Sequence, residues 1–291
     1  MIQEALYDTA IFLIKTLPIV AFASYLISYS LRRGYIEKLS RFLSPLIVRF
    51  RLSEMAILSI STCFLSPTAS YSILAQAWRE NKISGREVIA LSLLNSFPSA
   101  FSHLYTFFIP FVIPILGFAG LIYTLIRLLT SLIKSFLGYF LSIGWRTSHL
   151  PKSTQVSSPP SENLVRVSLI MATTYFLVSL FIKSGLLNFL PRSIELLPLP
   201  SESLMISAVS FLNARMAVVF AAGFQNTGLS WKWIVIGLIL GNVITLSARS
   251  IRHSLPMHMS LFGKFGLKIV LINSSITLLL DLIFIVIIYY I

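Results

Sequence analysis

Six apolar stretches, each long enough to cross a lipid bilayer, limit what this chain can fold into. A helix needs about 20 apolar residues to span the hydrocarbon core, and backbone in lipid must satisfy its own hydrogen bonds. The first stretch lacks the basic leader of a signal peptide, so we interpret it as a span as well. The pattern predicts an all-α polytopic membrane protein. The stretches lie near residues 9–31, 54–78, 111–143, 165–183, 203–225 and 266–291.

Composition agrees with that class. Only 11% of the 291 residues are charged, whereas a soluble domain has about 25%. The net charge of +13 would suit a nucleic-acid-binding protein, but the sequence offers no soluble domain to carry such a surface. We therefore expect no nucleic-acid partner, and we assign the basic excess to cytoplasmic loops that face anionic lipid. The single cysteine, Cys63, excludes an internal disulfide.

The chain contains two related halves. At an offset of 146 residues, Pro110 falls on Pro256, and Gly117 and Gly120 fall on Gly263 and Gly266. Small slips in the offset also align Ser53-Glu54 with Ser201-Glu202 and Asn95 with Asn242. We predict one repeat over 1–146, a polar linker over 147–164 with Pro159-Pro160, and a second repeat over 165–291. Paired repeats of this kind commonly build transporters, with the substrate site between the halves.

Two further apolar segments, 87–109 and 232–255, are interrupted at Asn95-Ser-Phe-Pro98 and at Gly241-Asn242. If both cross the membrane, the two repeats point the same way. If both are re-entrant hairpins, each repeat has about three spans and the second repeat is inverted. The inverted arrangement places more Lys and Arg on the cytoplasmic side, as the positive-inside rule requires. We therefore expect inverted repeats, each with one re-entrant broken-helix hairpin.

Residues 35–50 form an amphipathic pattern. Apolar residues such as Ile36, Leu39 and Leu43 recur at helical spacing, while Lys38, Arg41 and Arg49 lie elsewhere on the wheel. This pattern predicts a basic helix that lies in the membrane surface and contacts anionic lipid. An ordinary polar loop is the alternative.

Polar residues at the interruptions are the candidate substrate ligands. Asn95 and Ser99 stand at the first interruption, and Asn242 and Thr245 stand at the second, where the repeat offset places Thr245 on Ser99. The two breaks could form one polar site at the bilayer midplane, aided by free backbone groups at half-helix ends. The alternative is that these amides and hydroxyls only bond helices together.

The preceding segment of each half also contains a break. Ser66-Pro67-Thr68 interrupts 54–78, and Asn213-Ala-Arg215 occupies the corresponding place in 203–225. We expect Ser66, Thr68 and Asn213 to line the gap. A buried arginine costs about 2.5–3.5 kcal/mol to insert, so Arg215 needs a partner or an anionic ligand.

Asp281 is the one acidic residue deep in the last span, and Arg127 and Lys134 lie in the equivalent span of the first half. If the halves pack about a two-fold axis, Asp281 could form an ion pair with either cation. The alternative is that Asp281 couples transport to H⁺ or Na⁺.

The sequence carries no metalloprotease, Walker or nucleophile-elbow motif. Its four histidines have no ligand-type cysteine or carboxylate nearby in sequence. We therefore expect no catalytic residue, metal or cofactor. A membrane enzyme is a further alternative, with His103, His253 and Asp281 as its candidate reactive groups.

Several of these features occur together in a known family. Ser66-Pro67 is followed by Ile-Ser-Gly-Arg-Glu at 83–87, by Asn-Ser-Phe-Pro at 95–98, and by Pro110 with Gly117-x-x-Gly120-Leu. This order resembles the nucleoside-recognition (Gate-domain) membrane proteins, in particular a prokaryotic and largely archaeal branch. Relatives of the Gate domain occur in concentrative nucleoside transporters, ferrous iron transporters and spore maturation proteins. The chain lacks the GTPase domain of the iron transporters, and the resemblance implies a multi-pass protein of the cell membrane.

We therefore expect a transporter of a small polar or anionic solute, nucleoside-like solutes included, with its site between the two repeats. A lipid-handling or scaffold protein that docks through residues 35–50 is the alternative. Membrane lipids are expected partners in either case. The Gly-x-x-Gly pairs also allow a homodimer.

Overall fold

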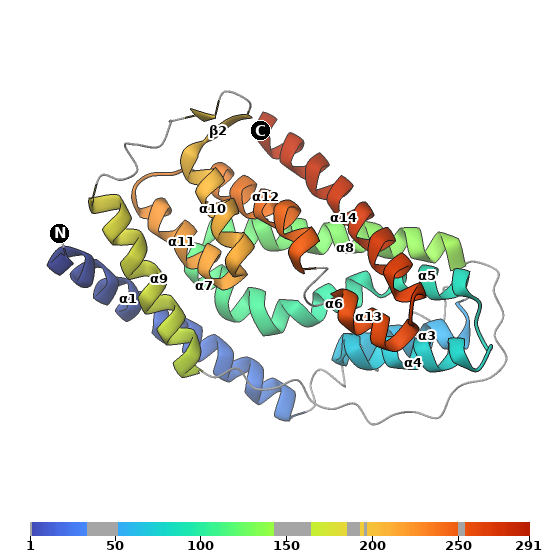
Figure 1. The fold of residues 1–291 in the computed structure, drawn as a ribbon. Coiled ribbons are helices and arrows are strands. Elements are labelled where there is room, and N and C mark those ends of the chain that lie inside the picture. The colour runs from blue at the N-terminus through green and yellow to red at the C-terminus, as the bar shows by residue number, and fades with distance from the viewer. Residues whose placement is uncertain (1, 34–51, 143–163, 185–192, 195–196, 250–253) are drawn as a thin grey trace.

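The computed structural model describes residues 2–33, 52–142, 164–184, 193–194, 197–249 and 254–291, and helices make up nearly all of them (Figure 1). The basic segment 35–50, with Lys38, Arg41 and Arg49, lies outside the described residues, as does nearly all of the linker over 147–164. The described first half contains α1 (Ile2–Arg32), α3 (Glu54–Leu65), α4 (Pro67–Arg79), α5 (Gly85–Leu94), α6 (Ser96–His103), the π-helix η1 (Leu104–Val112), α7 (Ile113–Leu116) and α8 (Phe118–Ser142).

The second half follows a similar order. A two-stranded antiparallel hairpin, with Ser193 opposite Pro200, precedes its first broken helix pair. The described elements are α9 (Leu164–Lys183), β1 (Ser193–Ile194), β2 (Leu197–Pro200), α10 (Ser201–Leu212), α11 (Ala214–Asn226), α12 (Trp231–Arg249), α13 (Leu255–Phe262) and α14 (Phe265–Tyr290).

Among the described residues, four helical runs are long and apolar enough to cross a membrane: Ile2–Phe22, Gly85–Leu116, Phe118–Ser142 and Phe265–Tyr290. Their outer faces are apolar, with Phe140 67% exposed on α8 and Val286 55% exposed on α14. Exposed apolar surface of this extent suits lipid rather than water. The chain is therefore a multi-pass helical membrane protein.

The expected breaks at Ser66 and Asn213 are present and share one backbone form. Both residues are extended, with φ/ψ of −150°/106° and −162°/130°. The Ser66 hydroxyl accepts a hydrogen bond from the N–H of Ala69, and the Asn213 amide oxygen accepts from the N–H groups of Arg215 and Met216. Each side chain thus caps the helix that follows it, and each apolar stretch becomes two short helices.

The glycine pairs make turns and close contacts. Gly117 and Gly263 have φ of +55° and +57°, which only glycine adopts readily, and they turn α7 into α8 and α13 into α14. A Cβ on Gly120 would lie 2.6 Å from the carbonyl oxygen of Val112, and one on Gly266 would collide with the carbonyl of His258. The two halves therefore use the same turn.

The segment expected to form the first re-entrant hairpin does not fold back, so that expectation was wrong for this segment. α5, α6, η1 and α7 follow one another along α8 (Figure 1). Asn95 stays near helical geometry at φ/ψ of −72°/−3°. Ser135 of α8 satisfies the backbone at the bend, because its hydroxyl donates to the Leu94 carbonyl at 2.7 Å and accepts from the Phe97 N–H at 2.8 Å.

The expected interruption at Gly241-Asn242 is also absent, because α12 continues through both residues to Arg249. Gly241 instead permits close packing: a Cβ there would lie 2.6 Å from the hydroxyl oxygen of Ser210 on α10. One turn earlier, a Cβ on Gly237 would lie 2.8 Å from the carbonyl oxygen of Ser203. These glycines therefore let two helices approach rather than break one of them.

The described residues form two apolar cores, and each is built from both halves. In the first lobe, α3, α4 and α5 pack with Phe262 of α13 and Ile269 of α14. In the second lobe, α10, α11 and α12 pack with α9 and with η1, α7 and α8 of the first half, including Val112 and Leu116. The halves exchange elements, so neither core is complete without the other half.

Candidate functional site

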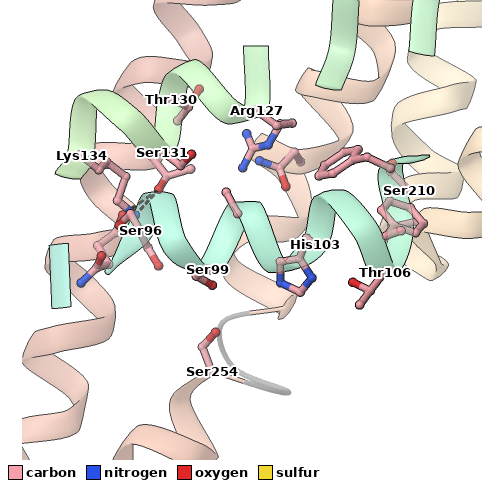
Figure 2. Close-up of a pocket in the computed structure, with 18 of the residues that line it drawn as sticks. Ser96, Ser99, His103, Thr106, Arg127, Thr130, Ser131, Lys134, Ser210 and Ser254 are labelled. Atoms are coloured by element: carbon pink, nitrogen blue, oxygen red, sulfur yellow. Dashed lines mark hydrogen bonds between the residues drawn. The ribbon is translucent and has the colours of Figure 1, made fainter. Parts of the chain in front are cut away.

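A cavity of about 740 Å³ lies between the lobes (Figure 2). It is lined from the first half by α6, η1 and α8, and from the second half by the end of α10, the start of α11, Asn242 of α12, α13 and α14. Hydroxyls, amides and aromatic rings alternate along the wall. The polar lining includes Tyr71, Ser96, Ser99, Thr106, Thr130, Ser131, Ser210, Asn213, Asn242, Asn273, Ser274 and Thr277.

Three strongly basic side chains line this cavity, and among the described residues no Asp or Glu lines it. Arg127 and Lys134 both come from α8, and their separation of about two helical turns places them on one face. Arg215 comes from the first turn of α11, with its guanidinium carbon 5.8 Å from the centroid of the Phe111 ring. This distance is within the range of a cation–π contact. The cavity wall is therefore electropositive.

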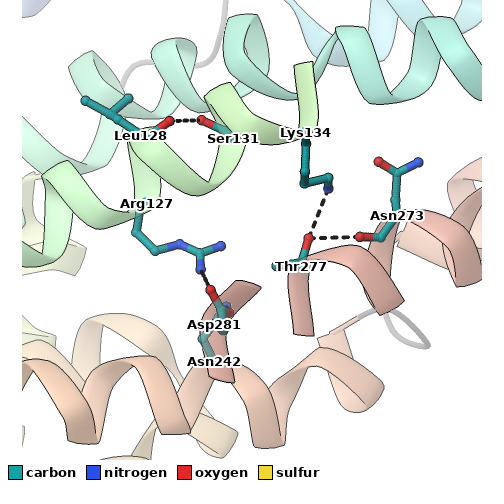
Figure 3. Close-up of polar contacts among 8 residues, drawn as sticks. All are labelled: Arg127, Leu128, Ser131, Lys134, Asn242, Asn273, Thr277 and Asp281. Carbon is teal, nitrogen blue, oxygen red and sulfur yellow. Dashed lines mark hydrogen bonds and ion pairs between the residues drawn. The ribbon is translucent and has the colours of Figure 1, made fainter. Parts of the chain in front are cut away.

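Arg127 is neutralised by a buried carboxylate behind the wall. Its Nη1 lies 2.6 Å from Oδ1 of Asp281, which is 0% exposed, and Nδ2 of Asn242 donates to Oδ2 of the same residue at 2.5 Å (Figure 3). Of the two ion pairs considered from the sequence, this is the one that forms. The three residues connect α8, α12 and α14.

Lys134 has a neutral partner instead. Its Nζ donates to the hydroxyl of Thr277 at 3.0 Å, and that hydroxyl donates to the carbonyl of Asn273 at 2.8 Å (Figure 3). The lysine is partly buried on α8 at the cavity wall. Its charge is therefore not balanced by direct contact with a carboxylate among the described residues.

His258 adds an aromatic nitrogen base to the wall. Its Nδ1 lies 2.8 Å from the Ser254 carbonyl oxygen, and its ring packs edge-on against Tyr71 at 4.5 Å. Burial lowers the pKa of His258, so its ring is predominantly neutral at pH 7. The positive charge of the cavity therefore comes from arginine and lysine. No three His, Cys, Asp or Glu residues gather into a metal site within the described part of the chain.

The structure brings half of the eight predicted substrate ligands to this cavity. Ser99, Asn213, Arg215 and Asn242 line it, together with Arg127 and Lys134. Thr245 belongs to α12, but its side chain lies outside the described part of the structure.

Asn95 does not line the cavity. It is 1% exposed and faces its own half, where its Nδ2 donates to the hydroxyls of Ser59 at 2.6 Å and Ser70 at 3.0 Å. Ser66 caps α4, and Thr68 is exposed in the first turn of that helix, so neither lines the cavity. These three predicted ligands therefore lie away from this cavity, because the break at Ser66 is closed by the serines and the asparagine around it.

Sequence reasoning missed the polar stripe of α14. Asn273 and Thr277 both line the cavity, and with Asp281 they recur every fourth residue on one face of α14, the most apolar of the four described membrane-length helices. The same stripe exists in α8, because Arg127, Ser131 and Ser135 align with these three residues at the repeat offset. That spacing was the available signal.

Residues 13–121 match the model of the protein family described as nucleoside recognition (Gate). Three proteins of Methanocaldococcus jannaschii are similar over nearly the whole chain. The uncharacterized protein MJ0871 is 39% identical, over 97% of this chain and 94% of its own. The uncharacterized proteins MJ0880 and MJ1556 are 25% and 23% identical, over 96% and 98% of this chain and 96% and 97% of their own. No solved structure matches.

Proposed function

Because the chain belongs to the nucleoside-recognition (Gate) family of multi-pass membrane proteins, we propose that it transports a small polar or anionic solute across the cell membrane. Nucleoside-like solutes fall within this class. The proposal rests on one observation, the polar and electropositive cavity between two lobes that each contain elements of both halves. Its volume of about 740 Å³ falls within the usual range of about 300–1,000 Å³ for small-molecule sites.

We further propose that the halves are inverted repeats related by a two-fold axis, with the broken helix pairs α3–α4 and α10–α11 as the re-entrant hairpins in place of 87–109 and 232–255. The helices of each pair pack against one another, and Ser59 of α3 bonds Ser70 of α4.

Reciprocal contacts support the two-fold relation. Gly85 at the start of α5 lies against the ring of Phe265, and Phe118 at the start of α8 lies edge-on to Trp231, with 5.6 Å between ring centroids. At the repeat offset Gly85 aligns with Trp231, and Phe118 lies one residue from the position aligned with Phe265.

The crossing of α8 and α14 favours an axis in the membrane plane. The first residue of the α8 stripe, Arg127, bonds the last residue of the α14 stripe, Asp281. Lys134, which precedes the last residue of the α8 stripe, bonds the middle residue of the α14 stripe, Thr277. The start of one stripe therefore lies beside the end of the other, so α8 and α14 run antiparallel where they cross (Figure 3). A two-fold axis that relates two antiparallel helices lies perpendicular to both. That geometry is typical of inverted repeats.

In this mechanism the solute binds between the lobes, and the lobes rock about the crossing to open the cavity to each side in turn. Ser99 and Asn242 offer hydrogen bonds to the solute, and Arg215 offers positive charge. Asp281 holds Arg127 at the wall. An H⁺ or Na⁺ gradient is the candidate driving force, and no resident cofactor takes part.

The test is uptake of a mixed metabolite panel into proteoliposomes, read by mass spectrometry with and without H⁺ or Na⁺ gradients. We expect selective accumulation by wild type and at least a tenfold loss in Ser99→Phe, which fills part of the cavity. Ser260→Phe is the matched control, because Ser260 is exposed on α13 and does not line the cavity. Absence of selective uptake from folded protein, or full uptake by Ser99→Phe, would contradict transport through this cavity.

The topology has its own test. Single cysteines placed at residues 147–161 in a Cys63→Ser background should react with an impermeant maleimide from the cytoplasmic side only. Reaction from outside would favour parallel repeats.

A further inference from the structure

Among the described residues, the two cations of α8 at the cavity wall differ in charge balance, and this difference indicates the class of solute. Arg127, Lys134 and Arg215 line the wall, while Asp281 is the buried carboxylate bonded to Arg127. We propose that the solute carries an oxyanion, a carboxylate or a phosphate, and that this group binds at Lys134. This inference rests on the proposed function and specifies the solute that the same cavity accepts.

The two cations of α8 differ in their partners. The Asp281 carboxylate has Arg127 on one oxygen and Asn242 on the other, so both of its oxygens are engaged. Within the described part of the chain, Lys134 bonds only the hydroxyl of Thr277, which accepts because its own proton goes to the Asn273 carbonyl. A lysine ammonium has three donors, so two remain for a ligand. Arg127 is therefore part of the scaffold, and Lys134 has donors left to bind a solute.

The surroundings of Lys134 suit an oxyanion. Figure 2 shows Lys134 with Ser96 and Ser131 at one end of the cavity, away from Thr106 and Ser210 at the other. The hydrogen bonds from Ser135 to Leu94 and Phe97 hold the start of α6 against this part of α8. The Ser131 hydroxyl already donates to the Leu128 carbonyl oxygen, so the donors offered to a carboxylate or phosphate are the Lys134 ammonium and the Ser96 hydroxyl.

The cost of a buried charge supports the same assignment. A lysine within a membrane-spanning helix is costly to insert and needs a partner or a wet cavity. An anionic solute would supply a charged partner in this cavity. Arg215, on the wall contributed by the second half, adds long-range attraction for the same solute.

The first experiment compares ligand-free stability and needs no ligand. Purified full-length protein is reconstituted in phosphatidylcholine nanodiscs and heated while tryptophan fluorescence is followed. Lys134→Gln is expected to unfold at or above the wild-type temperature, because it removes an unbalanced charge. Arg127→Gln is expected to unfold several degrees lower, because it leaves Asp281 without its cation. Equal destabilisation by both variants would make Lys134 a structural partner and overturn the proposal.

The second experiment uses matched pairs of probes on the same nanodiscs. The pairs are uridine 5′-monophosphate with uridine, and succinate with succinamide, and inorganic phosphate is added as a minimal anion. We expect stabilisation by at least one anion but by neither neutral probe. Lys134→Gln should weaken the apparent affinity for that anion at least tenfold. Lys268→Gln removes the same charge from an exposed position of α14 that does not line the cavity, and it should leave the affinity unchanged.

The outcomes separate this inference from the transport proposal. Binding of an anion through Lys134 without uptake of any panel solute would leave the anion site standing and remove transport. Uptake of neutral solutes alone, unaffected by Lys134→Gln, would keep transport and remove the anion site. Absence of stabilisation by every anion would also overturn the inference. If phosphatidylglycerol in the nanodisc stabilises wild type but not Lys134→Gln, the phosphate belongs to a lipid headgroup.

Discussion

The two helix breaks, at Ser66 and at Asn213, have the same backbone form but opposite surroundings. Behind Ser66, Asn95 bonds Ser59 and Ser70 within its own half, and the break is closed. Around Asn213, the residues 210–215 line the cavity, and the equivalent of Asn95, Asn242, bonds Asp281 instead. The two breaks have similar backbone frames, and the side chains behind each frame decide which one faces the cavity. The first break is a structural joint, and the second is part of the site.

The largest effect on stability should come from the Arg127–Asp281 ion pair, which joins α8 of the first half to α14 of the second. Asp281→Leu leaves Arg127 without its carboxylate, so we expect a loss of about 3–5 kcal/mol in unfolding free energy. The double variant Arg127→Leu/Asp281→Leu should recover much of that loss. Denaturation in nanodiscs measures both, and a double variant no more stable than Asp281→Leu would contradict the view that the unpaired Arg127 causes the loss.

The two asparagines should respond differently to leucine. Asn95→Leu removes the donor to two buried hydroxyls and should cost about 1–3 kcal/mol while leaving solute affinity unchanged. Asn242→Leu removes an amide from the cavity wall, so it should also reduce uptake at least tenfold. Stability and uptake are measured on the same preparations. Equal loss of solute affinity in both variants would remove the contrast between the halves.

Helix packing within the halves offers a finer comparison. A Cβ on Gly138 of α8 would lie 2.6 Å from the Ala90 carbonyl oxygen and would also meet the Leu94 backbone, whereas one on Gly237 would lie 2.8 Å from the Ser203 carbonyl oxygen. Gly138→Ala should therefore cost about 1–3 kcal/mol and more than Gly237→Ala. Thermal unfolding of the two variants tests the order, and the reverse order would mean that α10 and α12 pack more rigidly than α5 and α8.

The smallest effects should come from the caps. Ser66→Ala and Asn213→Ala each remove one capping side chain and should each cost about 1 kcal/mol. Only Asn213→Ala should alter solute affinity, because only Asn213 lines the cavity. An affinity change in Ser66→Ala would indicate that the first break also reaches the solute.

Much of the architecture could be predicted because hydropathy and caps are local signals. The breaks at Ser66 and Asn213 were predicted correctly, since Pro67 and Asn213 interrupt apolar stretches. The interruptions at Asn95 and Gly241 were misread, because a glycine or amide in an apolar helix can serve packing as well as breakage. Whether it does so depends on a neighbour such as Ser135 or Ser210, which a linear reading of the chain does not reveal.

The site was partly predictable for the same reason. Arg127, Lys134, Arg215 and Asn242 stood out because charge and amide are rare in apolar helices. Asn273 and Thr277 required attention to their spacing of four residues. The distinction between Arg127 and Lys134 came only from three-dimensional proximity, because the residues that bond them lie more than 140 positions further along the chain.

The exchange of elements between the halves also has a consequence for how the protein is made. The core around α3, α4 and α5 includes Phe262 and Ile269, which leave the ribosome well after the helices they pack against. Domains usually fold as units as they are synthesised. Here the helices of the first lobe must wait in the membrane with an unfilled core until α13 and α14 have been made. A chain truncated before α13 would therefore lose the fold of its first lobe as well as its C-terminus.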